Sequence, residues 1–289
     1  MGSNNDFIIQ TVGNVVIDTM IHVENFPNEG IACKVKNSFI CGGASLNIAR
    51  AYKYFTNKKI TVSACYGKDF FKYIDRSSID EICNINNTHT DVNATKAYVL
   101  CCVNNASRTG LVEWGACRTT PKMIIDCDWT HFSYCDTLDD LSKEKIKNIN
   151  GIKSADLTSF DYTQKKRERV KDCLKSMNYI ICSPEEASAL LEVEDLNYLA
   201  LQLGTMCKNF VIMHTPEGSY VSDGSVVDFI SASHPVNRKF DVVGAGDTFA
   251  AAFIKNVLNN IKNKEIYDVV VLTHLDVYSY LSNRSGDIK

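Results

Sequence analysis

A loop of small residues near the end of the chain runs directly into an alanine-rich stretch. The segment Asp241-Val-Val-Gly-Ala-Gly-Asp-Thr-Phe-Ala-Ala-Ala-Phe253 contains Gly244, Ala245 and Gly246 just before the predicted helix. Glycines let successive backbone N–H groups turn toward one point, and a helix N-terminus adds about half a positive charge there. The segment therefore predicts an anion-binding site that would fit a phosphate oxygen.

Asp247 lies in the first turn of this predicted helix. A carboxylate beside a transferring phosphoryl group can accept the proton of an attacking hydroxyl, which typically contributes about 10²–10⁴ in rate. Aspartate at a helix start also serves as a cap, and glycines also permit close packing. On spacing alone, a general base and a helix cap both stay open.

A second set of residues suits the binding of hydroxyl groups. Gly42 and Gly43 permit close approach of a ligand, Asn47 follows them, and Asp18 ends an earlier apolar run. A carboxylate and an amide together offer acceptors and donors to a polyol. In isolation, a tight turn followed by an amide on a helix surface is the more common meaning of such a pattern.

The elements that must position these residues follow from the hydrophobic pattern. An apolar run over 7–12, interrupted at Gly13 and resumed over 15–18, predicts one buried strand. Two strands joined by a polar turn, 96–103 and 108–114, predict a hairpin. Further strands are predicted at 32–40, 60–65, 129–132, 179–182 and 210–213, and helices at 46–52, 141–149, 163–177, 184–191 and 196–207. Their alternation after residue 123 favours βα units and a largely parallel sheet.

Composition narrows the class of protein. The chain has 289 residues and a 45% apolar fraction, with no internal repeat or linker, so we expect one domain over 1–289. A net charge of −3 gives no general reason to expect nucleic acid or a membrane surface as partner. Without a recognisable leader or a bilayer-length apolar run, we expect a cytoplasmic protein whose twelve scattered cysteines are mostly reduced. A dinucleotide-binding oxidoreductase is disfavoured because no G-x-G-x-x-G follows the first strand.

The two glycine-containing stretches together resemble the two signatures of the pfkB, or ribokinase-like, carbohydrate kinases. Cys41-Gly-Gly-Ala-Ser-Leu-Asn-Ile-Ala49 resembles the first, and Asp241-Val-Val-Gly-Ala-Gly-Asp-Thr-Phe249 resembles the second, which is the more specific. Weaker matches also fall in sequence order, before the first signature at Gly13 to Asp18, Pro27 and Gly30, and between the two signatures at Gly67-x-Asp69, Arg108-Thr109 and Gly115-Ala116. The resemblance spans nearly the whole chain.

This resemblance implies a doubly wound α/β domain, a mostly parallel sheet flanked by helices, with a small β-lid formed by parts of 11–40 and 93–114. It also implies ATP-dependent phosphoryl transfer to a hydroxyl of a sugar or sugar-like substrate, with ATP and Mg²⁺ as cofactors. Asp247 would be the base, and Gly244, Ala245 and Gly246 would form the anion hole. The implied substrate-binding residues are Asn14, Asp18, Gly42, Gly43, Asn47 and Arg108. An exposed hairpin arginine is an equally good interpretation of Arg108.

The nucleotide side departs from the family pattern. Ser183-Pro-Glu-Glu186 stands where relatives carry Asn-x-x-Glu, and Met213-His-Thr-Pro-Glu-Gly218 stands where they carry Thr-x-Gly-x-x-Gly. Asp156 is not followed by the usual Asp-x-Asn-x-Arg pattern. By resemblance, the nucleotide-binding residues are Ser183, Glu186, Thr215 and Gly218. Glu186 would act on the metal through water, and Asp241 would lie near a monovalent cation such as K⁺.

These departures leave two alternatives open. One is a catalytically weak relative that binds a sugar or nucleoside as a sensor, although a pure binder has no need of Asp247. The other is a nucleoside kinase of the same fold. The expected partner is a small molecule, and the resemblance also implies a homodimer formed through the lid, supported by the apolar residues of 98–103.

Overall fold

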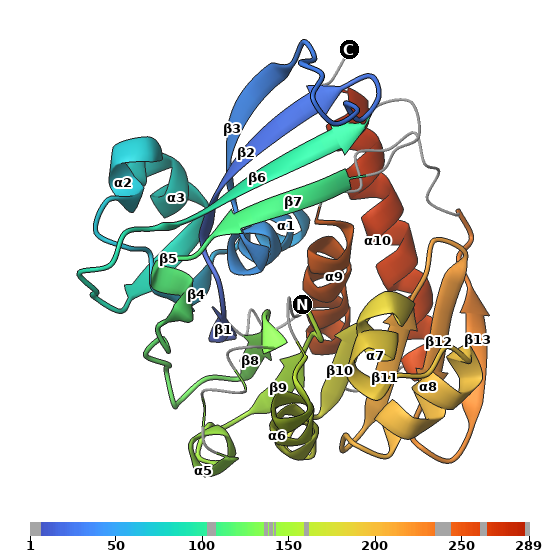
Figure 1. The fold of residues 1–289 in the computed structure, drawn as a ribbon. Helices are drawn as coiled ribbons and strands as arrows, with labels where there is room; N and C mark the ends of the chain where they lie inside the picture. The colour runs from blue at the N-terminus through green and yellow to red at the C-terminus, as the bar shows by residue number, and fades with distance from the viewer. Residues whose placement is uncertain are drawn as a thin grey trace.

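The structure, a computed structural model, describes residues 7–102, 108–135, 138, 141, 143–158, 162–234, 244–260 and 265–286. Within these ranges the chain forms a nine-stranded sheet and a separate four-stranded sheet. Figure 1 shows the smaller sheet projecting from one end of the larger one. This arrangement agrees with the predicted α/β fold with a small additional sheet.

The large sheet is mostly parallel. Its strands are β1 (Ile9–Val12), β4 (Ile60–Ala64), β5 (Cys83–Asn87), β8 (Trp129–Phe132), β9 (Ile152–Ala155), β10 (Tyr179–Cys182), β11 (Phe210–His214), β12 (Gly218–Ser222) and β13 (Val227–Ser231). They lie in the order β13-β12-β11-β10-β9-β8-β1-β4-β5, and β12 and β13 run antiparallel to their neighbours. The chain builds outward in opposite directions from β1 and β8, so the strand order reverses between these two parallel neighbours.

The small sheet contains β2 (Val16–Val23), β3 (Lys36–Gly42), β6 (Thr95–Cys102) and β7 (Arg108–Glu113), in the order β3-β2-β6-β7. Its residues come from the two segments predicted to form the lid. The prediction of one interrupted strand over 7–18 was wrong, because β1 and β2 belong to different sheets. The chain crosses between them at Gly13, where a Cβ atom would lie 2.3 Å from Ser133 Oγ. Only glycine fits so close a crossing.

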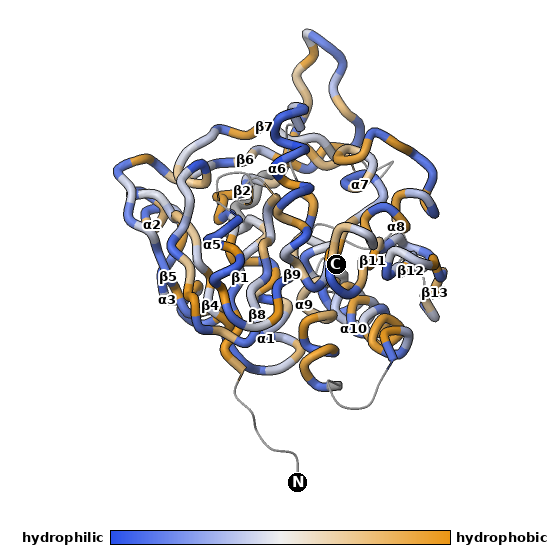
Figure 2. The backbone as a smooth tube through the Cα atoms, turned by 90° about the horizontal axis from the view of Figure 1, so that it is seen from below, coloured by the Kyte–Doolittle hydropathy of each residue, from blue (hydrophilic) through white to orange (hydrophobic). Residues whose placement is uncertain are grey.

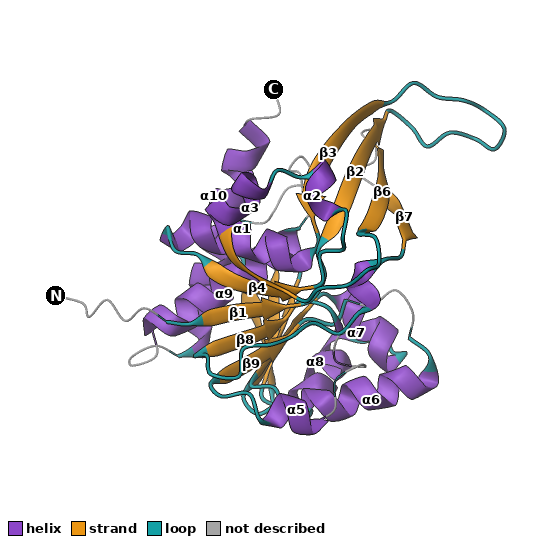
Figure 3. Cartoon of the chain, turned by 90° about the vertical axis from the view of Figure 1, so that its left-hand side faces the viewer, coloured by secondary structure: helices purple, strands orange, loops and turns teal. Residues whose placement is uncertain are grey.

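Helices cover both faces of the large sheet, as Figure 3 shows. The described helices are α1 (Ala44–Thr56), α2 (Phe70–Tyr73), α3 (Arg76–Ile82), η1 (Ala116–Arg118), α5 (Lys143–Lys147), α6 (Gln164–Leu174), α7 (Pro184–Leu191), α8 (Leu196–Gly204), α9 (Ala245–Asn260) and α10 (Ile266–Gly286). One face carries α1, α9 and α10, and the other carries α5 to α8. No described helix combines the length and apolar character needed to cross a membrane.

Each face of the sheet has its own core. On one face, Trp129 stacks on Tyr179 with ring centroids 5.6 Å apart, and Tyr179 meets Phe253 of α9 edge-on at 5.2 Å. On the other face, α6 buries only its apolar residues, such as Val170 and Leu174, and turns its charged residues outward. Figure 2 shows the largely hydrophilic course of α6. Burying these two apolar layers fixes the strand ends that carry the candidate site.

Candidate active site

Three predicted site residues, and one acidic residue that was not predicted, lie at the carboxyl ends of the parallel strands. Asn14 follows β1, Asp156 follows β9, Ser183 follows β10, and Thr215 follows β11. In open α/β sheets, ligands bind outside these strand ends, at the point where the strand order reverses. Here that point lies between β1 and β8.

Asp247 and Asn47 are in direct contact, although 200 positions separate them in the sequence. The Asn47 Nδ2 atom donates a hydrogen bond of 2.8 Å to Asp247 Oδ2. Asn47 lies in the first turn of α1 and Asp247 in the first turn of α9, and the two helices pack against each other. The structure thus brings together the acidic residue of the second signature and the amide of the first.

The glycine loop precedes α9 in the conformation that an anion nest requires. Gly244 has φ +73°, in the left-handed region, and a Cβ atom there would lie 3.2 Å from Asn47 Nδ2. The first turn closes with a 2.9 Å bond from Thr248 N to Gly244 O. The amides of Ala245 and Gly246 come before that bond, so the helix offers them no carbonyl acceptor. Within the described part of the chain no bond from these two amides is seen, so they can bind a negatively charged ligand.

Asp18 lies directly over the paired glycines. A Cβ atom on Gly42 would lie 1.4 Å from Asp18 Oδ2, so this carboxylate occupies the space a side chain would fill. Burial raises the pKa of Asp18 to about 6, while a hydrogen bond from the Gly43 backbone and the charge of Arg50 act in the opposite direction. The carboxylate is thus largely ionised above pH 6 and positioned to accept hydrogen bonds.

Asn14 makes a structural contact at the same place. Its Oδ1 atom accepts a 2.9 Å hydrogen bond from the backbone of Ala44, at the start of α1. Gly43 has φ +89°, and a Cβ atom there would lie 2.8 Å from the Asn14 carbonyl oxygen. Asn14 therefore joins the crossing between the sheets to the beginning of α1.

Sequence reasoning did not place Asp156 in the site, yet its carboxyl group lies close to two predicted residues. Burial is the main cause of its strongly raised pKa, and the carboxylates of Glu186 and Asp247 raise it further. Its Oδ1 atom accepts a 3.1 Å hydrogen bond from Thr158 N. It lies directly after β9, a place where ligands bind in such sheets, but β9 is Ile-Lys-Ser-Ala and has no apolar run that would have marked it in the sequence.

His131 is a second residue that the sequence did not reveal. It is fully buried, its Nδ1 lies 2.8 Å from Ser154 Oγ, and its Nε2 lies 3.9 Å from Asp156 Oδ2. Within the described part of the chain, Nε2 has no hydrogen-bond partner. Burial lowers the pKa of His131 to about 3, so the ring is neutral beside the acidic group.

Ser183 and Glu186 form a capping box at the start of α7. Ser183 Oγ accepts from Glu186 N at 3.3 Å, and Glu186 Oε2 accepts from Ser183 N at 2.9 Å. The other oxygen, Oε1, accepts a 2.6 Å bond from the Thr158 hydroxyl. Serine therefore replaces the family asparagine as a helix cap, and Glu186 is held rigidly beside Asp156.

The carboxyl groups of Asp156 and Glu186 are suited to binding a magnesium ion. No group of three or more metal-ligating side chains occurs among the described residues. Magnesium in phosphoryl-transfer sites needs only one or two carboxylates, because water and substrate phosphates complete its coordination. The donor chemistry of Asp156 and Glu186 therefore fits a hydrated Mg²⁺ ion.

Thr215 and Gly218 make the turn between β11 and β12. Thr215 N donates to Gly218 O at 2.7 Å, and Thr215 Oγ1 accepts from Gly218 N at 3.2 Å. The neighbouring His214 stacks on Phe249 of α9 at 4.9 Å, and its ring lies 3.5 Å from where a Cβ on Gly246 would be. The turn predicted to bind nucleotide thus adjoins the glycine nest.

The structure does not describe the side chains of two predicted residues. Arg108 begins β7 in the small sheet, but the position of its side chain is outside what the structure describes. Asp241 also lies outside the described residues. Their assignment to substrate phosphate and to a monovalent cation stays a prediction.

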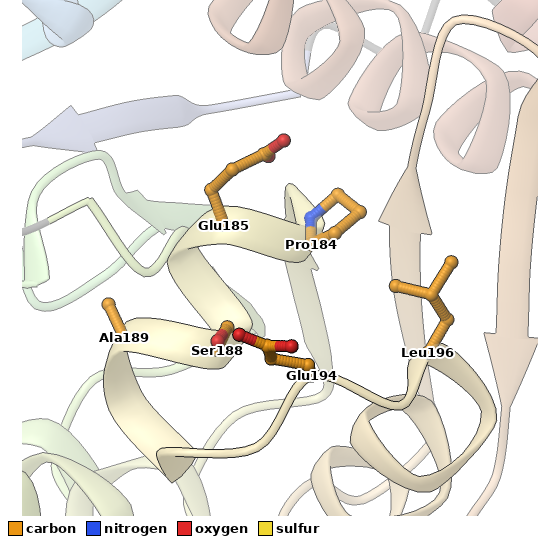
Figure 4. A pocket seen from close by; sticks show the side chains of 6 residues that line it. All are labelled: Pro184, Glu185, Ser188, Ala189, Glu194 and Leu196. Atoms are coloured by element: carbon orange, nitrogen blue, oxygen red, sulfur yellow. The ribbon is translucent and has the colours of Figure 1, made fainter.

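A pocket lies next to the Ser183–Glu186 segment. Figure 4 shows Glu185 and Pro184 at one side of it, Ser188 and Glu194 close together, and Leu196 of α8 opposite. Ala189 also lines it. The pocket adjoins the predicted nucleotide side through α7 and includes none of the predicted site residues.

Comparison with known proteins explains this arrangement. The model of the family described as pfkB family carbohydrate kinase matches residues 9–271. The chain belongs to the pfkB family. Membership of this family supports the conclusion that the protein is a kinase that acts on a sugar or a nucleoside. A search of curated proteins found no match.

Solved structures share the fold of this pfkB family member. Ribokinase from Thermotoga maritima superposes with a TM-score of 0.77 at 16% identity, covering 96% of this chain and 93% of that one. Adenosine kinase from Sinorhizobium meliloti gives 0.74 at 16% identity, covering 96% and 94%. Fructokinase from Vibrio cholerae gives 0.72 at 14% identity, covering 97% and 100%. These superpositions establish the ribokinase-like fold, and the low identities leave the substrate open.

Proposed function

We propose that this protein transfers the γ-phosphoryl group of ATP to a hydroxyl of a small sugar-like substrate. The observation that carries the proposal is the contact between Asp247 and Asn47 beside the glycine nest. The residues proposed as base, anion site and hydroxyl-binding amide lie within the first turns of two packed helices, which supports the proposal. Phosphoryl transfer depends mainly on such positioning and on charge stabilisation.

Each residue has a defined part in the proposed reaction. Asp18 and Asn47 bind the acceptor, and Asp247 accepts the proton of the attacking hydroxyl. The hydroxyl oxygen forms a bond to the γ-phosphorus as the bond to the bridging oxygen breaks, and ADP leaves. The amides of Ala245 and Gly246 stabilise the charge that spreads over the transferred group. Bound Mg²⁺ would neutralise phosphate charge, with Asp156 and Glu186 holding its water.

The substrate class follows from the groups that surround the acceptor site. A buried carboxylate and an amide favour a ligand rich in hydroxyl groups, which a furanose or an open-chain sugar provides. Ribokinase, fructokinase and adenosine kinase all occur among the structural relatives, so ribose, fructose and adenosine are natural test substrates. We favour a sugar because Asp18, Asn47 and the paired glycines suit the hydroxyl groups of a polyol.

The proposal is tested by measuring ADP release with sugars, sugar amines and nucleosides in the presence of Mg²⁺, with and without K⁺. Turnover with a sugar, lost in Asp247→Asn, supports it. If only nucleosides are phosphorylated, the acceptor is a nucleoside and not a sugar. No turnover with any acceptor, together with thermal stabilisation by a sugar, would overturn the enzymatic function and favour a sensor.

A further inference from the structure

The orientation of the Asn47 side chain depends on a residue one turn further along α1. The Arg50 NH1 atom donates a 3.2 Å hydrogen bond to Asn47 Oδ1, and Asn47 Nδ2 donates a 2.8 Å bond to Asp247 Oδ2. Arginine can only donate, and an ionised carboxylate can only accept. The amide between them therefore has one favourable orientation, with its oxygen toward Arg50 and its nitrogen toward Asp247.

The opposite orientation would be unfavourable at both ends. Rotating the amide by half a turn would place its oxygen against the Asp247 carboxylate and its NH₂ group against the Arg50 guanidinium. Both hydrogen bonds would become repulsive contacts in a partly buried place. Gly244 leaves room for this pair, because a Cβ atom there would lie 3.2 Å from Asn47 Nδ2 and 3.4 Å from Asp247 Oδ2.

The same guanidinium acts on the other acidic residue of the acceptor site. Arg50 lowers the pKa of Asp18, against the larger effect of burial. The Cys117 thiol of η1 also interacts with Asp18. Burial raises the pKa of that thiol to about 11, so it is uncharged at neutral pH. Arg50 is the charged side chain that lowers the pKa of Asp18.

We propose that Arg50 is a positioning residue that holds the Asn47 amide in the one orientation in which it donates to Asp247. Through Asn47 it sets the direction of the proposed base, and through its charge it favours the ionised form of Asp18. One side chain outside the reacting groups thus organises both carboxylates that face the acceptor. The inference rests on the proposed kinase function for its kinetic consequences but not for its structural ones.

The kinetic test compares Arg50→Met with Arg50→Lys. Arg50→Met is expected to lower kcat about tenfold to a hundredfold, the usual effect of losing a hydrogen bond to a charged group. In the pH profile of kcat/KM, the acidic limb should also move to higher pH, because Asp18 loses the positive charge that favours its ionised form. Arg50→Lys keeps the charge, so the limb should stay in place while kcat falls less. Arg76→Met, which removes an exposed arginine paired with Asp80 on α3, is the matched control.

A purely structural contribution of Arg50 would lower the amount of folded protein without moving the acidic limb. Wild-type kcat and an unmoved limb in Arg50→Met would overturn the proposal. So would an equal shift of the limb in Arg50→Lys and Arg50→Met, because charge would then not be the cause.

A second readout does not depend on catalysis. The side-chain amide resonances of Asn47, assigned by their loss in Asn47→Ser, should shift in Arg50→Met and remain in place in Arg76→Met. Unchanged Asn47 resonances in Arg50→Met would overturn the proposal. If the wild-type protein transfers phosphate to no acceptor, the proposed function fails, and these resonances still decide whether Arg50 orients Asn47.

Discussion

The acceptor side and the nucleotide side of the site are built in different ways. On the acceptor side, the Asn47–Asp247 bond joins residues 200 positions apart, and the Ala44–Asn14 bond joins residues 30 apart. On the nucleotide side, the capping box at Ser183 and the turn at Thr215 each close within three residues. The first side depends on contacts between distant segments, whereas the second combines two local motifs with the longer-range bond from Thr158 to Glu186. Substitutions should therefore affect catalysis on the first side and local stability on the second.

The largest effect is expected from Asp247→Asn. The amide cannot accept the hydroxyl proton, so kcat should fall by about 10²–10⁴ while the Kd for ATP changes little. Steady-state kinetics and nucleotide titration measure the two quantities. A mutant as fast as the wild type would exclude Asp247 as the base. The comparison between a catalytic acceptor side and a locally built nucleotide side would then lose its basis.

Gly42→Ala should weaken the acceptor side alone. The new Cβ atom would lie only 1.4 Å from the present position of Asp18 Oδ2 and would displace the carboxylate. The KM for the acceptor should rise about tenfold to a hundredfold, with the KM for ATP nearly unchanged.

Gly110→Ala in β7 is the matched control for this substitution. A Cβ atom there would meet only the Tyr98 carbonyl oxygen, at 3.9 Å. This variant should keep wild-type kinetics. Equal effects of the two substitutions would mean that the small sheet tolerates neither, and that Asp18 has no special importance.

Asp18→Asn separates acceptor binding from stability. Because the pKa of Asp18 is raised from 3.8 to about 6 in the folded protein, the ionised carboxylate destabilises the fold as the pH rises through this range. Replacing it should raise the free energy of unfolding at pH 7.5 by up to about 3 kcal/mol, while kcat/KM for the acceptor falls. The wild-type acidic limb near pH 6 should disappear in this variant. A destabilised variant that keeps this limb would contradict the assignment.

The smallest effect is expected on the nucleotide side. Ser183→Ala removes the side-chain cap of α7 and should lower the free energy of unfolding by about 1 kcal/mol. The KM for the acceptor should not change. Ser183→Asn keeps a good cap and restores the family residue, so its stability should match the wild type. A change in acceptor KM in either variant would show that the two sides are coupled.

Sequence patterns predicted elements well where an apolar run or a cap marks them. The strand predicted over 179–182 and the helix over 184–191 coincide with β10 and α7. The strand β9 was missed because it consists of Ile-Lys-Ser-Ala and has no apolar run. Its Lys153 is nevertheless buried, with the ammonium donating a 2.6 Å bond to Ile149 O. The antiparallel pair β12 and β13 was also not predicted.

The candidate site was predictable only in part. The motifs identified Asp247, the glycines and Asn47 by residue type and order. Nothing local indicated that Arg50 would orient Asn47, or that the buried His131 would face Asp156. These contacts depend on which strands become neighbours, and that order is a property of the assembled sheet. Whether one domain spans 1–289, and whether the chain pairs through the small sheet, stay predictions.

The passage of the chain between sheets at Gly13 has an evolutionary consequence. Under the proposed function, Asp18 binds the acceptor from the small sheet and Asp247 acts from a helix on the large one, so part of the choice of acceptor is encoded apart from the phosphate chemistry. Mutations in the small sheet can diversify the acceptor without altering the catalytic helix. Such a division allows one ancestral scaffold to generate kinases for many alcohols.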